Sequence, residues 1–272
     1  MSYGLLKGKK GIISGALDEN SIAWKVALKA KEEGATFTLT NAPIAMRMGA
    51  INQLAEQCDA KVIAADATSV EDLEKLYTES MDVLGGKVDF VLHSIGMSPN
   101  VRKGKQYGDL NYEWYMKSLD VSALSFHKFM QVAEKVDAIN EWGSFVALSY
   151  IAAQRAFPFY NDMADAKATL ESIARSYGYR YAKAKKVRVN TISQSPTPTT
   201  AGTGIGGFDS FFEFADKMSP LGNASADDCA NYVITLFSDL TRMVTMQNLF
   251  HDGGYSTTGI SEDLMAMIQK NA

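Results

Sequence analysis

The sequence predicts an α/β fold in which a doubly wound, seven-stranded parallel sheet carries helices on both faces. Short runs of apolar or β-branched residues recur seven times along the chain. The longer stretches between them place apolar residues at three- and four-residue steps, which is typical of helices that pack along one side. Strands that are almost entirely apolar and alternate with helices indicate a parallel sheet buried on both faces, with right-handed crossovers.

The predicted strands follow one another with helical patterns between them. They are residues 11–14, 36–40, 61–65, 88–94, 143–149, 187–193 and 248–254. Ile22, Val26 and Ala30 give the helical step after the first strand, and Val233 and Phe237 give it before the last. In such a sheet, ligands bind beyond the carboxyl ends of the strands, so the loops after strands one, four, five and six are the places to search.

A single domain spanning residues 1–272 is expected, because no repeat, low-complexity tract or linker divides the chain. The run at 195–207 is rich in glycine and threonine and predicts a long loop. We expect a mobile substrate-binding segment around residues 195–217.

The composition argues against several classes of protein. The chain has 272 residues, 46% of them hydrophobic, and a net charge of −4 with no basic cluster, so no nucleic-acid partner is expected. Cys58, Cys229 and three histidines show no metal-binding spacing, so no metal is expected. The first ten residues are too polar for a signal peptide, and no apolar run approaches the roughly 18 residues of a membrane span. We therefore expect a soluble, cytoplasmic protein.

The turn after the first strand is the first candidate cofactor loop. A turn that leads from a strand into a helix points backbone N–H groups and the positive end of the helix dipole at a bound pyrophosphate. A glycine-rich dinucleotide loop would have three glycines here, whereas this chain has only Gly15. Ser21 and Ile22 occupy the later positions. Ser21 could equally be an ordinary helix cap. Asp18 and Glu19 would repel a phosphate unless their carboxylates turn away from it.

The ends of strands two, three and four offer further candidates. Asn41 stands where an NAD site usually has an acid for the ribose, while Arg47 could reach a 2′-phosphate, so this loop does not decide between NADH and NADPH. Asp66 is placed for an adenine edge or, equally, for capping the next helix. Gly96 follows strand four and would let the backbone approach a ligand closely.

A tyrosine and a lysine after the fifth strand form the candidate catalytic pair. At 100° per residue, a helix that begins near Tyr160 brings Lys167 back to within about 20° of the same face. A lysine ammonium near a phenol favours the phenolate, and it can also hold ribose hydroxyls. A single tyrosine is more often structural, but this pair follows the carboxyl end of a strand, and Pro158 breaks the chain just before the helix.

These features resemble the short-chain dehydrogenase/reductase superfamily and its Rossmann-like fold. Ordinary members carry the lysine four residues after the tyrosine, where this chain has Ala164. The later lysine resembles the divergent branch of that superfamily, the bacterial enoyl-[acyl-carrier-protein] reductases of type II fatty-acid synthesis. The segments SIAW, HSIG, SYIAAQRAFPFYNDMADAK, VRVN and DGG occur in the order of that branch, from about Gly4 to Ser256.

The resemblance implies hydride transfer from NADH, or from NADPH, to the β-carbon of a 2-enoyl thioester carried on acyl-carrier protein. Tyr160 would hydrogen-bond the thioester carbonyl, Lys167 would hold the nicotinamide ribose, and Tyr150 would line the acyl pocket. A homotetramer is also implied, with the helices after strands four and five at its interfaces. The remaining implied positions are Gly15, Ser21 and Ile22 for the pyrophosphate, Asp66 and Ala67 for the adenine, Ser94, Ile95 and Gly96 beside the nicotinamide, Pro196, Thr197 and Thr199 above it, and Met97, Met163 and Phe208 for the acyl chain.

The segment after strand six departs from this family. Ala-Gly-Pro-Ile-x-Thr usually stands there, whereas this chain has Gln194, Ser195 and Thr197 in place of the alanine, glycine and isoleucine, and retains Pro196 and Thr199. Ser195 therefore replaces a glycine where the backbone can approach a ligand closely. The geometry of the lid is the part of the site that the resemblance predicts least.

Two other functions remain open at this point. A carbonyl or hydroxyl oxidoreductase of the same superfamily would need a serine as proton-relay partner, and Ser149 lies near the usual position. A protein that binds NAD(P) as a sensor without turnover is the second alternative. The presence of both Tyr160 and Lys167 argues against a sensor.

Overall fold

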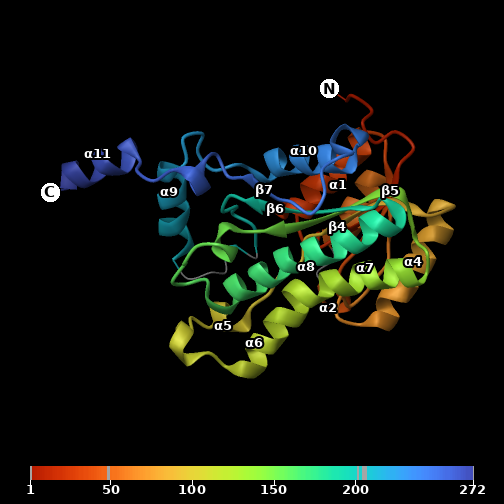
Figure 1. Ribbon diagram of the computed structural model, residues 1–272, viewed down its shortest axis with the longest axis horizontal. Helices are drawn as coiled ribbons and strands as arrows, with labels where there is room; N and C mark the ends of the chain where they lie inside the picture. The colour runs from red at the N-terminus through yellow and green to blue at the C-terminus, as the bar shows by residue number, and fades with distance from the viewer. Residues whose placement is uncertain (1, 48–49, 201, 204–206, 272) are drawn as a thin grey trace.

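A seven-stranded sheet runs through the centre of the computed structural model, which describes residues 2–47, 50–200, 202–203 and 207–271 (Figure 1). Its strands are β1 (Lys10–Ser14), β2 (Thr36–Thr40), β3 (Lys61–Val62), β4 (Val88–His93), β5 (Ile139–Ser149), β6 (Arg188–Gln194) and β7 (Asn248–His251). Their order in the sheet is β3-β2-β1-β4-β5-β6-β7, and each neighbouring pair is parallel. The predicted α/β class with a doubly wound parallel sheet is confirmed.

Helices cover both faces of this sheet (Figure 1). They are α1 (Ile22–Glu32), α2 (Pro43–Met46), α3 (Ala50–Cys58), α4 (Val70–Leu84), α5 (Pro99–Arg102), α6 (Tyr112–Leu119), α7 (Ser125–Lys135), α8 (Asn161–Lys185), α9 (Phe208–Met218), α10 (Ala226–Phe237) and α11 (Glu262–Asn271). In β1, Ile13 packs in a core with α1, α3 and α10, while Ile12 packs in a second core with α4, α7 and α8. Consecutive side chains of a strand point to opposite faces, so a sheet buried on both sides needs apolar residues at every position.

The switch point of the sheet lies between β1 and β4, which are direct neighbours. Gly15, the residue after β1, has φ +92°, and a Cβ placed on it would lie 2.0 Å from the carbonyl oxygen of Ser94. Only glycine fits there without moving the backbone. The chain therefore brings the first and fourth loops into direct contact at the edge of the sheet where this fold class binds ligands.

Three strands differ in length from their predicted ranges by three or more residues. β3 contains two residues instead of the predicted five, although the N–H groups of Ile63 and Ala65 still donate to the neighbouring strand and loop at 2.9 and 3.1 Å. β7 ends at His251 because Gly253 and Gly254, with φ +64° and +95°, form a turn. β5 begins at Ile139, earlier than predicted, and its register against β4 shifts near its start.

A π-helical turn joins α6 to α7. It spans Asp120–Leu124 and inserts a wider turn into what is otherwise one long helix. Such turns are rare and occur often near functional sites, because they change which side chains face a neighbouring element. Here the turn directs Ser122 toward the loop that follows β4.

Both cysteines are free and buried, Cys58 at 2% exposure and Cys229 at 0%. Burial raises the pKa of the Cys58 thiol to about 11 and that of the Cys229 thiol to about 12. Among the described residues, no group of histidine, cysteine or acidic side chains could hold a metal ion. None of the described helices is both long enough and apolar enough to cross a membrane.

Candidate active site

Tyr160 occupies the position immediately before α8, and Lys167 lies in the second turn of that helix. Asn161, the first helical residue, has φ +43° and is fixed by a hydrogen bond from its side-chain amide to the carbonyl of Lys105. Because the backbone at Asn161 is left-handed, a count of 100° per residue does not extend back to Tyr160. The predicted helix start is correct, but the angular argument for the pair is not.

Contacts with neighbouring elements bring the pair together instead. The Lys167 ammonium donates to the carbonyl of Leu148 at 2.6 Å. Leu148 lies two residues before Tyr150, and the ring centroid of Tyr150 lies 5.2 Å from that of Tyr160. On the other side, a Cβ placed on Gly96 would lie 3.7 Å from Lys167 Nζ and 3.8 Å from Met163 Cε. Tyr160 also packs against the apolar cluster that contains Met163. Both tyrosines, the lysine and Gly96 therefore border one region beyond the ends of β4 and β5.

Lys167 is buried, with 7% of its surface exposed. Burial lowers its pKa to about 8, and the Glu171 carboxylate one turn further along α8 opposes that shift. Glu171 in turn accepts hydrogen bonds from Ser149 Oγ at 2.7 Å and from Gln154 Nε2 at 3.0 Å. Since the hydroxyl proton of Ser149 is directed at Glu171, its geometry does not favour the serine relay of a carbonyl reductase.

Burial raises the pKa of both tyrosines, and for Tyr160 it is the sole cause. The expectation that Lys167 favours a Tyr160 phenolate is therefore wrong, because desolvation disfavours the charged phenol and the lysine bonds to a carbonyl. Tyr160 stays neutral and remains a hydrogen-bond donor. The Tyr150 hydroxyl is buried, and within the part of the chain that the structure describes it has no hydrogen-bond partner.

Five aromatic rings form a cluster around Tyr150, which we call the aromatic cluster. Its members are Tyr150, Phe157, Tyr160, Phe211 and Tyr255. Tyr150 lies 5.3 Å from Phe157 and 6.0 Å from Phe211, measured between ring centroids. Sequence reasoning missed Phe157, Phe211 and Tyr255. Only Phe157 could have been found from the sequence, because it lies in the AFPFY stretch that ends at Tyr160. Phe211 and Tyr255 come from distant parts of the chain.

Phe208, the residue predicted to face the acyl chain, lies at the start of α9. Its ring packs on Phe212 at 5.8 Å, whereas Phe211 of the same helix contacts Tyr150. Met97, also predicted for the acyl chain, is held through its backbone: its N–H donates to Ser122 Oγ at 3.0 Å, and that hydroxyl is 3.2 Å from its carbonyl. Ser122 was missed because the π-helical turn cannot be read from hydrophobic periodicity.

A buried carboxylate joins α8 to the loop and helices after β4. Asp162, two residues after Tyr160, is fully buried. It accepts hydrogen bonds from Ser98 at 2.6 Å, Ser118 at 2.8 Å and Asn100 at 2.9 Å. Since breaking a satisfied buried network is costly, this arrangement fixes the wall of the site beside Tyr160.

The first candidate cofactor loop is closed by Ser21, which does not cap α1. Its hydroxyl accepts from the N–H of Leu17 at 3.3 Å and donates to the carbonyl of Asp18 at 2.6 Å. The Ile22 side chain packs into the core, so its backbone is the part that can face a ligand. One oxygen of Asp18 accepts from the N–H of Asn20 and the other from the hydroxyl of Thr200, so the carboxylate is occupied within the protein.

The loop after β2 is tied to the loop after β1. The Asn41 amide donates to the carbonyl of Ala16 at 3.0 Å and accepts from the N–H of Ala42 at 2.8 Å. Arg47 is exposed just beyond α2. Asn41 thus closes the turn where a ribose-binding acid would otherwise stand.

Asp66 does not cap the following helix. Its Oδ1 accepts from the N–H and hydroxyl of Thr68 at 2.8 and 2.7 Å, while Ser69 caps α4 by accepting from the N–H of Asp72. Ala67 and Ile95, which follow β3 and β4, both pack on the same apolar core. The contact of Asp66 and Ala67 with the adenine stays a prediction.

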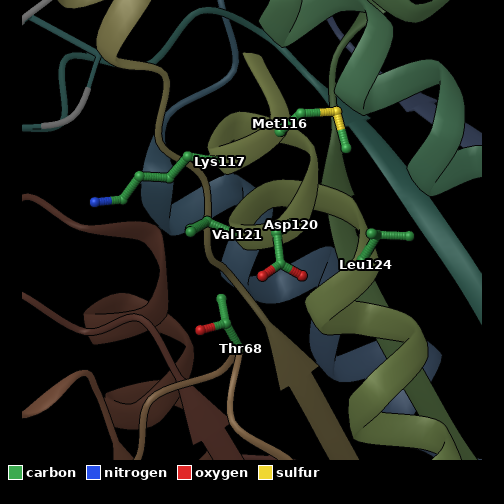
Figure 2. Close-up of a pocket in the computed structure, with 6 residues that line it drawn as sticks. All are labelled: Thr68, Met116, Lys117, Asp120, Val121 and Leu124. Atoms are coloured by element: carbon green, nitrogen blue, oxygen red, sulfur yellow. The ribbon is translucent and has the colours of Figure 1, made fainter. Parts of the chain in front are cut away.

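Beside this loop lies an open groove of about 450 Å³ that sequence reasoning did not find (Figure 2). Thr68 lines one side, and the end of α6 with the π-helical turn lines the other through Met116, Lys117, Asp120, Val121 and Leu124. Lys128 bridges the two sides, donating to the carbonyl of Thr68 at 2.8 Å and to the Asp120 carboxylate at 2.6 Å. The groove thus runs from the loop with Asp66 and Ala67 toward α6.

The chain after β6 forms a covering segment, by which we mean the described residues between Ser195 and Ala224. Pro196 and Thr197 are buried, and the Thr197 hydroxyl donates to the carbonyl of Ser195 at 3.0 Å. The Thr199 hydroxyl accepts from the N–H of Gly202 at 3.0 Å. Of the predicted loop, residues 201 and 204–206 lie outside the described residues. From Phe208 onward the predicted substrate-binding segment is helix α9.

A family model described as "Enoyl-(Acyl carrier protein) reductase" matches residues 15–256 of the chain. The chain belongs to the enoyl-(acyl carrier protein) reductase family. Among its relatives in this reductase family is the "Enoyl-[acyl-carrier-protein] reductase [NADH] 1" of Rhizobium meliloti, which is 32% identical over 267 residues, covering 94% of this chain and 93% of that protein. The FabI of Rickettsia bellii is 34% identical, covering 95% of this chain and 98% of that protein.

Solved structures of the reductase family share the whole fold. The FabI-NADH complex from Alistipes finegoldii superposes with a TM-score of 0.95 at 66% identity, covering 96% of this chain and 92% of that chain. A second FabI structure from the same organism gives a TM-score of 0.93 at 62% identity, covering 99% of this chain and 98% of that chain. The recognition of the family from its sequence motifs is confirmed.

Proposed function

We propose that this chain reduces the 2,3 double bond of trans-2-enoyl thioesters carried on acyl-carrier protein, with NADH as reductant, in the last step of the fatty-acid elongation cycle. One observation carries this proposal: in a chain of the enoyl-(acyl carrier protein) reductase family, Tyr160, Lys167 and Gly96 border one region beside the aromatic cluster, in which Tyr150 is buried and the other rings are half-buried. That region lies between the proposed dinucleotide-binding site and the proposed apolar binding site for the acyl chain.

The residues present fit NADH. The surface above Gly96 is open, since a Cβ there would meet only ordinary contacts with Lys167 and Met163, and Gly15 lets the first loop pass directly over Ser94. When bound, NADH supplies the hydride. Lys167 would hold the nicotinamide ribose. The other holding residues are Gly15, Ser21 and Ile22 at the pyrophosphate, Asp66 and Ala67 at the adenine, and Ser94, Ile95, Gly96, Pro196, Thr197 and Thr199 around the nicotinamide.

Tyr160 acts on the thioester oxygen. As the β-carbon is reduced, negative charge develops on that oxygen, and a neutral phenol donates its strongest hydrogen bond to it at that moment. A donor that binds the charged oxygen more strongly than the carbonyl lowers the barrier, typically by about 3–4 kcal/mol. The high pKa that burial gives Tyr160 suits this role, because the phenol must keep its proton to donate. The enolate then collapses by protonation at the α-carbon.

The aromatic cluster is the place we assign to the acyl chain next to the thioester. Tyr150 lines it and offers a second hydroxyl near the thioester. Met97, Met163 and Phe208 belong to the same predicted set, and we add Phe211, because α9 places its ring against Tyr150. We favour NADH over NADPH because the similar reductases of Rhizobium meliloti and Rickettsia bellii are named for NADH, while the exposed Arg47 keeps NADPH as an alternative to be tested.

Several wider properties belong to the same proposal. The chain acts as one domain over residues 1–272, meets acyl-carrier protein as its partner, and works in the cytoplasm, where NADH is available. Movement of the substrate-binding segment around 195–217 would admit the acyl chain.

We also propose a homotetramer built on the helices after β4 and β5, where α7 and α8 present an exposed groove of about 270 Å³ with His127, Ile173 and Tyr177. Sedimentation that gives only monomer at micromolar concentration would refute the tetramer.

The activity is tested by the loss of NADH absorbance, with NADPH in parallel, when the protein meets a short 2-enoyl thioester or a 3-oxoacyl thioester. Oxidation with the enoyl substrate alone supports the proposal. Oxidation with the oxoacyl substrate alone would assign the chain to carbonyl reduction, and binding of NADH with no oxidation would favour a sensor.

Replacing Tyr160 by phenylalanine tests its role in the reaction. We expect Tyr160→Phe to lower kcat on the order of 100- to 1000-fold, because it removes one preorganised donor, while the dissociation constant of NADH changes little. Steady-state kinetics and fluorescence titration with NADH measure the two effects. Unchanged turnover would remove Tyr160 from the mechanism.

A further inference from the structure

Three parts of the chain meet where the covering segment leaves β6 and returns toward α10. We infer that Gln194 and Ser195 are positioning residues that clamp both ends of the covering segment together, and so hold α9 over the aromatic cluster for the enoyl substrate. The link to the substrate depends on the proposed function, whereas the clamp itself does not.

Gln194 is buried, with 4% of its surface exposed. Its side-chain nitrogen donates to the carbonyl of Ala224 at 3.0 Å and lies 3.5 Å from the carbonyl of Ser225. Its oxygen lies 2.7 Å from Nδ1 of His251. Because carbonyls can only accept, the amide nitrogen must face Ala224, and the oxygen must accept from the imidazole. One side chain at the end of β6 thus joins β7 to the returning chain.

His251 keeps this bond in either protonation state. The neutral tautomer that carries its proton on Nδ1 and the imidazolium both present a donor to Gln194. The ring is also stacked on Tyr232 of α10, with centroids 5.0 Å apart and an angle of 15°. The hydrogen bond between His251 and Gln194 therefore persists when the histidine titrates.

Ser195 completes the hold on the returning chain. Its hydroxyl accepts from the N–H of Ala224 at 3.0 Å, and its own N–H donates to the carbonyl of His251 at 3.1 Å. Both backbone groups of Ala224 are therefore bound by two consecutive residues of the outgoing chain. In the pattern usual for this family, alanine and glycine stand at these two positions, and neither has a side chain that could make such bonds.

The turn after β7 supports the joint from the other side. The N–H of Leu221 donates to the carbonyl of Gly253 at 3.1 Å. A Cβ placed on Gly253 would lie 2.0 Å from the carbonyl oxygen of Gly222, so the returning chain passes directly against this glycine. Glycine at position 253 of the DGG motif therefore leaves space for the covering segment to pass at Gly222.

The joint is connected to α9 by direct bonds. The N–H of Asn223, next to Ala224, donates to the Asp216 carboxylate at 2.9 Å, and its side chain donates to the carbonyl of Phe212 at 2.9 Å. From the same helix, Phe211 reaches Tyr150. A displacement at Ala224 would therefore move the aromatic wall of the acyl site, which is how a residue outside that wall can set the affinity for substrate.

Gln194→Met is the variant that tests the clamp. Methionine keeps the length and the apolar volume of the side chain but removes its hydrogen bonds to Thr197, Ala224, Ser225 and His251. We expect amide hydrogen exchange in α9 to become about tenfold faster and KM for a short 2-enoyl thioester to rise about tenfold, with kcat changed by less than about threefold. Exchange in β1 and β4 should not change. Gln53→Met, on the exposed face of α3, is the matched control and should match the unmodified chain in each measurement.

Unchanged exchange in α9 of Gln194→Met would overturn the clamp, whatever the activity. Faster exchange throughout the protein would also overturn it, because it would mean a general loss of stability. If Gln194→Met does not fold, Ser195→Ala, which removes one acceptor, should give about fivefold faster exchange in α9. The exchange measurement needs no turnover, so a chain inactive on enoyl thioesters would refute the proposed function while leaving this test of the clamp intact.

Discussion

The loop after β1 and the covering segment after β6 lie at the same edge of the sheet but are held by different means. The first is held by backbone geometry: Gly15 has φ +92° and no room for a Cβ beside Ser94. The second is held by side chains: Gln194 and Ser195 bind both backbone groups of Ala224. A backbone constraint admits one residue type, whereas a side-chain joint can be built by different residues in related proteins. The covering segment is therefore the region where this chain departs from its family's usual pattern.

Among the variants that test the difference between these two regions, Gly15→Ala is expected to have the largest effect. The added methyl would lie 2.0 Å from a carbonyl oxygen at a positive φ, so the loop must shift. We expect the free energy of unfolding to fall by about 2–4 kcal/mol, from overpacking and left-handed strain together, and NADH affinity to fall about 100-fold. Urea denaturation and fluorescence titration with NADH measure these changes.

Gly96→Ala is the matched control for that prediction. Its added methyl would find its nearest neighbours at 3.7 and 3.8 Å, which is ordinary contact. The free energy of unfolding should change by less than about 1 kcal/mol, although NADH affinity falls because the methyl occupies the surface beside Lys167. Equal destabilisation of the two variants would contradict the backbone constraint at Gly15. Faster exchange in α9 of Gly15→Ala would show that the two regions are not independently held.

A pH profile gives an intermediate effect and concerns Lys167, which is held by burial and by Leu148. Its pKa of about 8 means that the ammonium is lost as the pH rises through 8. Since kcat/KM reports the free enzyme, we expect kcat/KM to fall about tenfold per pH unit above that point. Initial rates from pH 6 to pH 10 at low substrate concentration would show it. A flat profile to pH 10 would contradict a role for the charged lysine.

Loss of activity in that range should not come from unfolding at Lys167. Its pKa in the folded protein lies below the ordinary value of 10.5, so between about pH 8 and 10.5 the unfolded chain binds more protons at this residue. Stability then rises with pH through this one group. Urea denaturation at pH 8 and pH 10 on the protein and on Lys167→Met separates this contribution from that of other groups, and a contribution of the opposite sign would contradict the lowered pKa.

The smallest effect is expected where the two regions touch. Asp18, in the loop after β1, accepts a hydrogen bond from Thr200 of the covering segment at the surface. Exposed bonds of this kind contribute little, so Asp18→Ala should change NADH affinity by no more than about twofold. The same titration used for Gly15→Ala measures it. A tenfold loss would mean that this contact couples the regions, and the comparison between them would fail.

Much of the fold could be predicted because parallel sheets impose simple patterns. Ile12 and Ile13 must both be apolar when each face is buried, and the carboxyl ends of neighbouring strands meet at one edge, so Gly96 and Lys167 could be expected near one another. The aromatic cluster could not be predicted in full, because Phe211 and Tyr255 reach Tyr150 only through tertiary packing.

Other misses have local causes. Ser122 faces Met97 because of a π-helical turn that leaves no mark in hydrophobic spacing. The proposed clamp was visible in the sequence only as departures at Gln194 and Ser195, since their partners lie far away in the chain. The Tyr160 pKa was predicted in the wrong direction, because the sequence places the lysine near the phenol but does not reveal how far burial excludes water from the ring.

The two buried cysteines make this chain a convenient host for optical probes. Thiol reagents attack thiolates, and with pKa values of about 11 and 12, Cys58 and Cys229 carry almost no thiolate at neutral pH and are shielded by their neighbours. A single new cysteine on the exposed side of α9, for example at Phe214, could therefore accept a fluorophore without removal of the native thiols. The motion of α9 during turnover could then be followed in an otherwise unmodified chain.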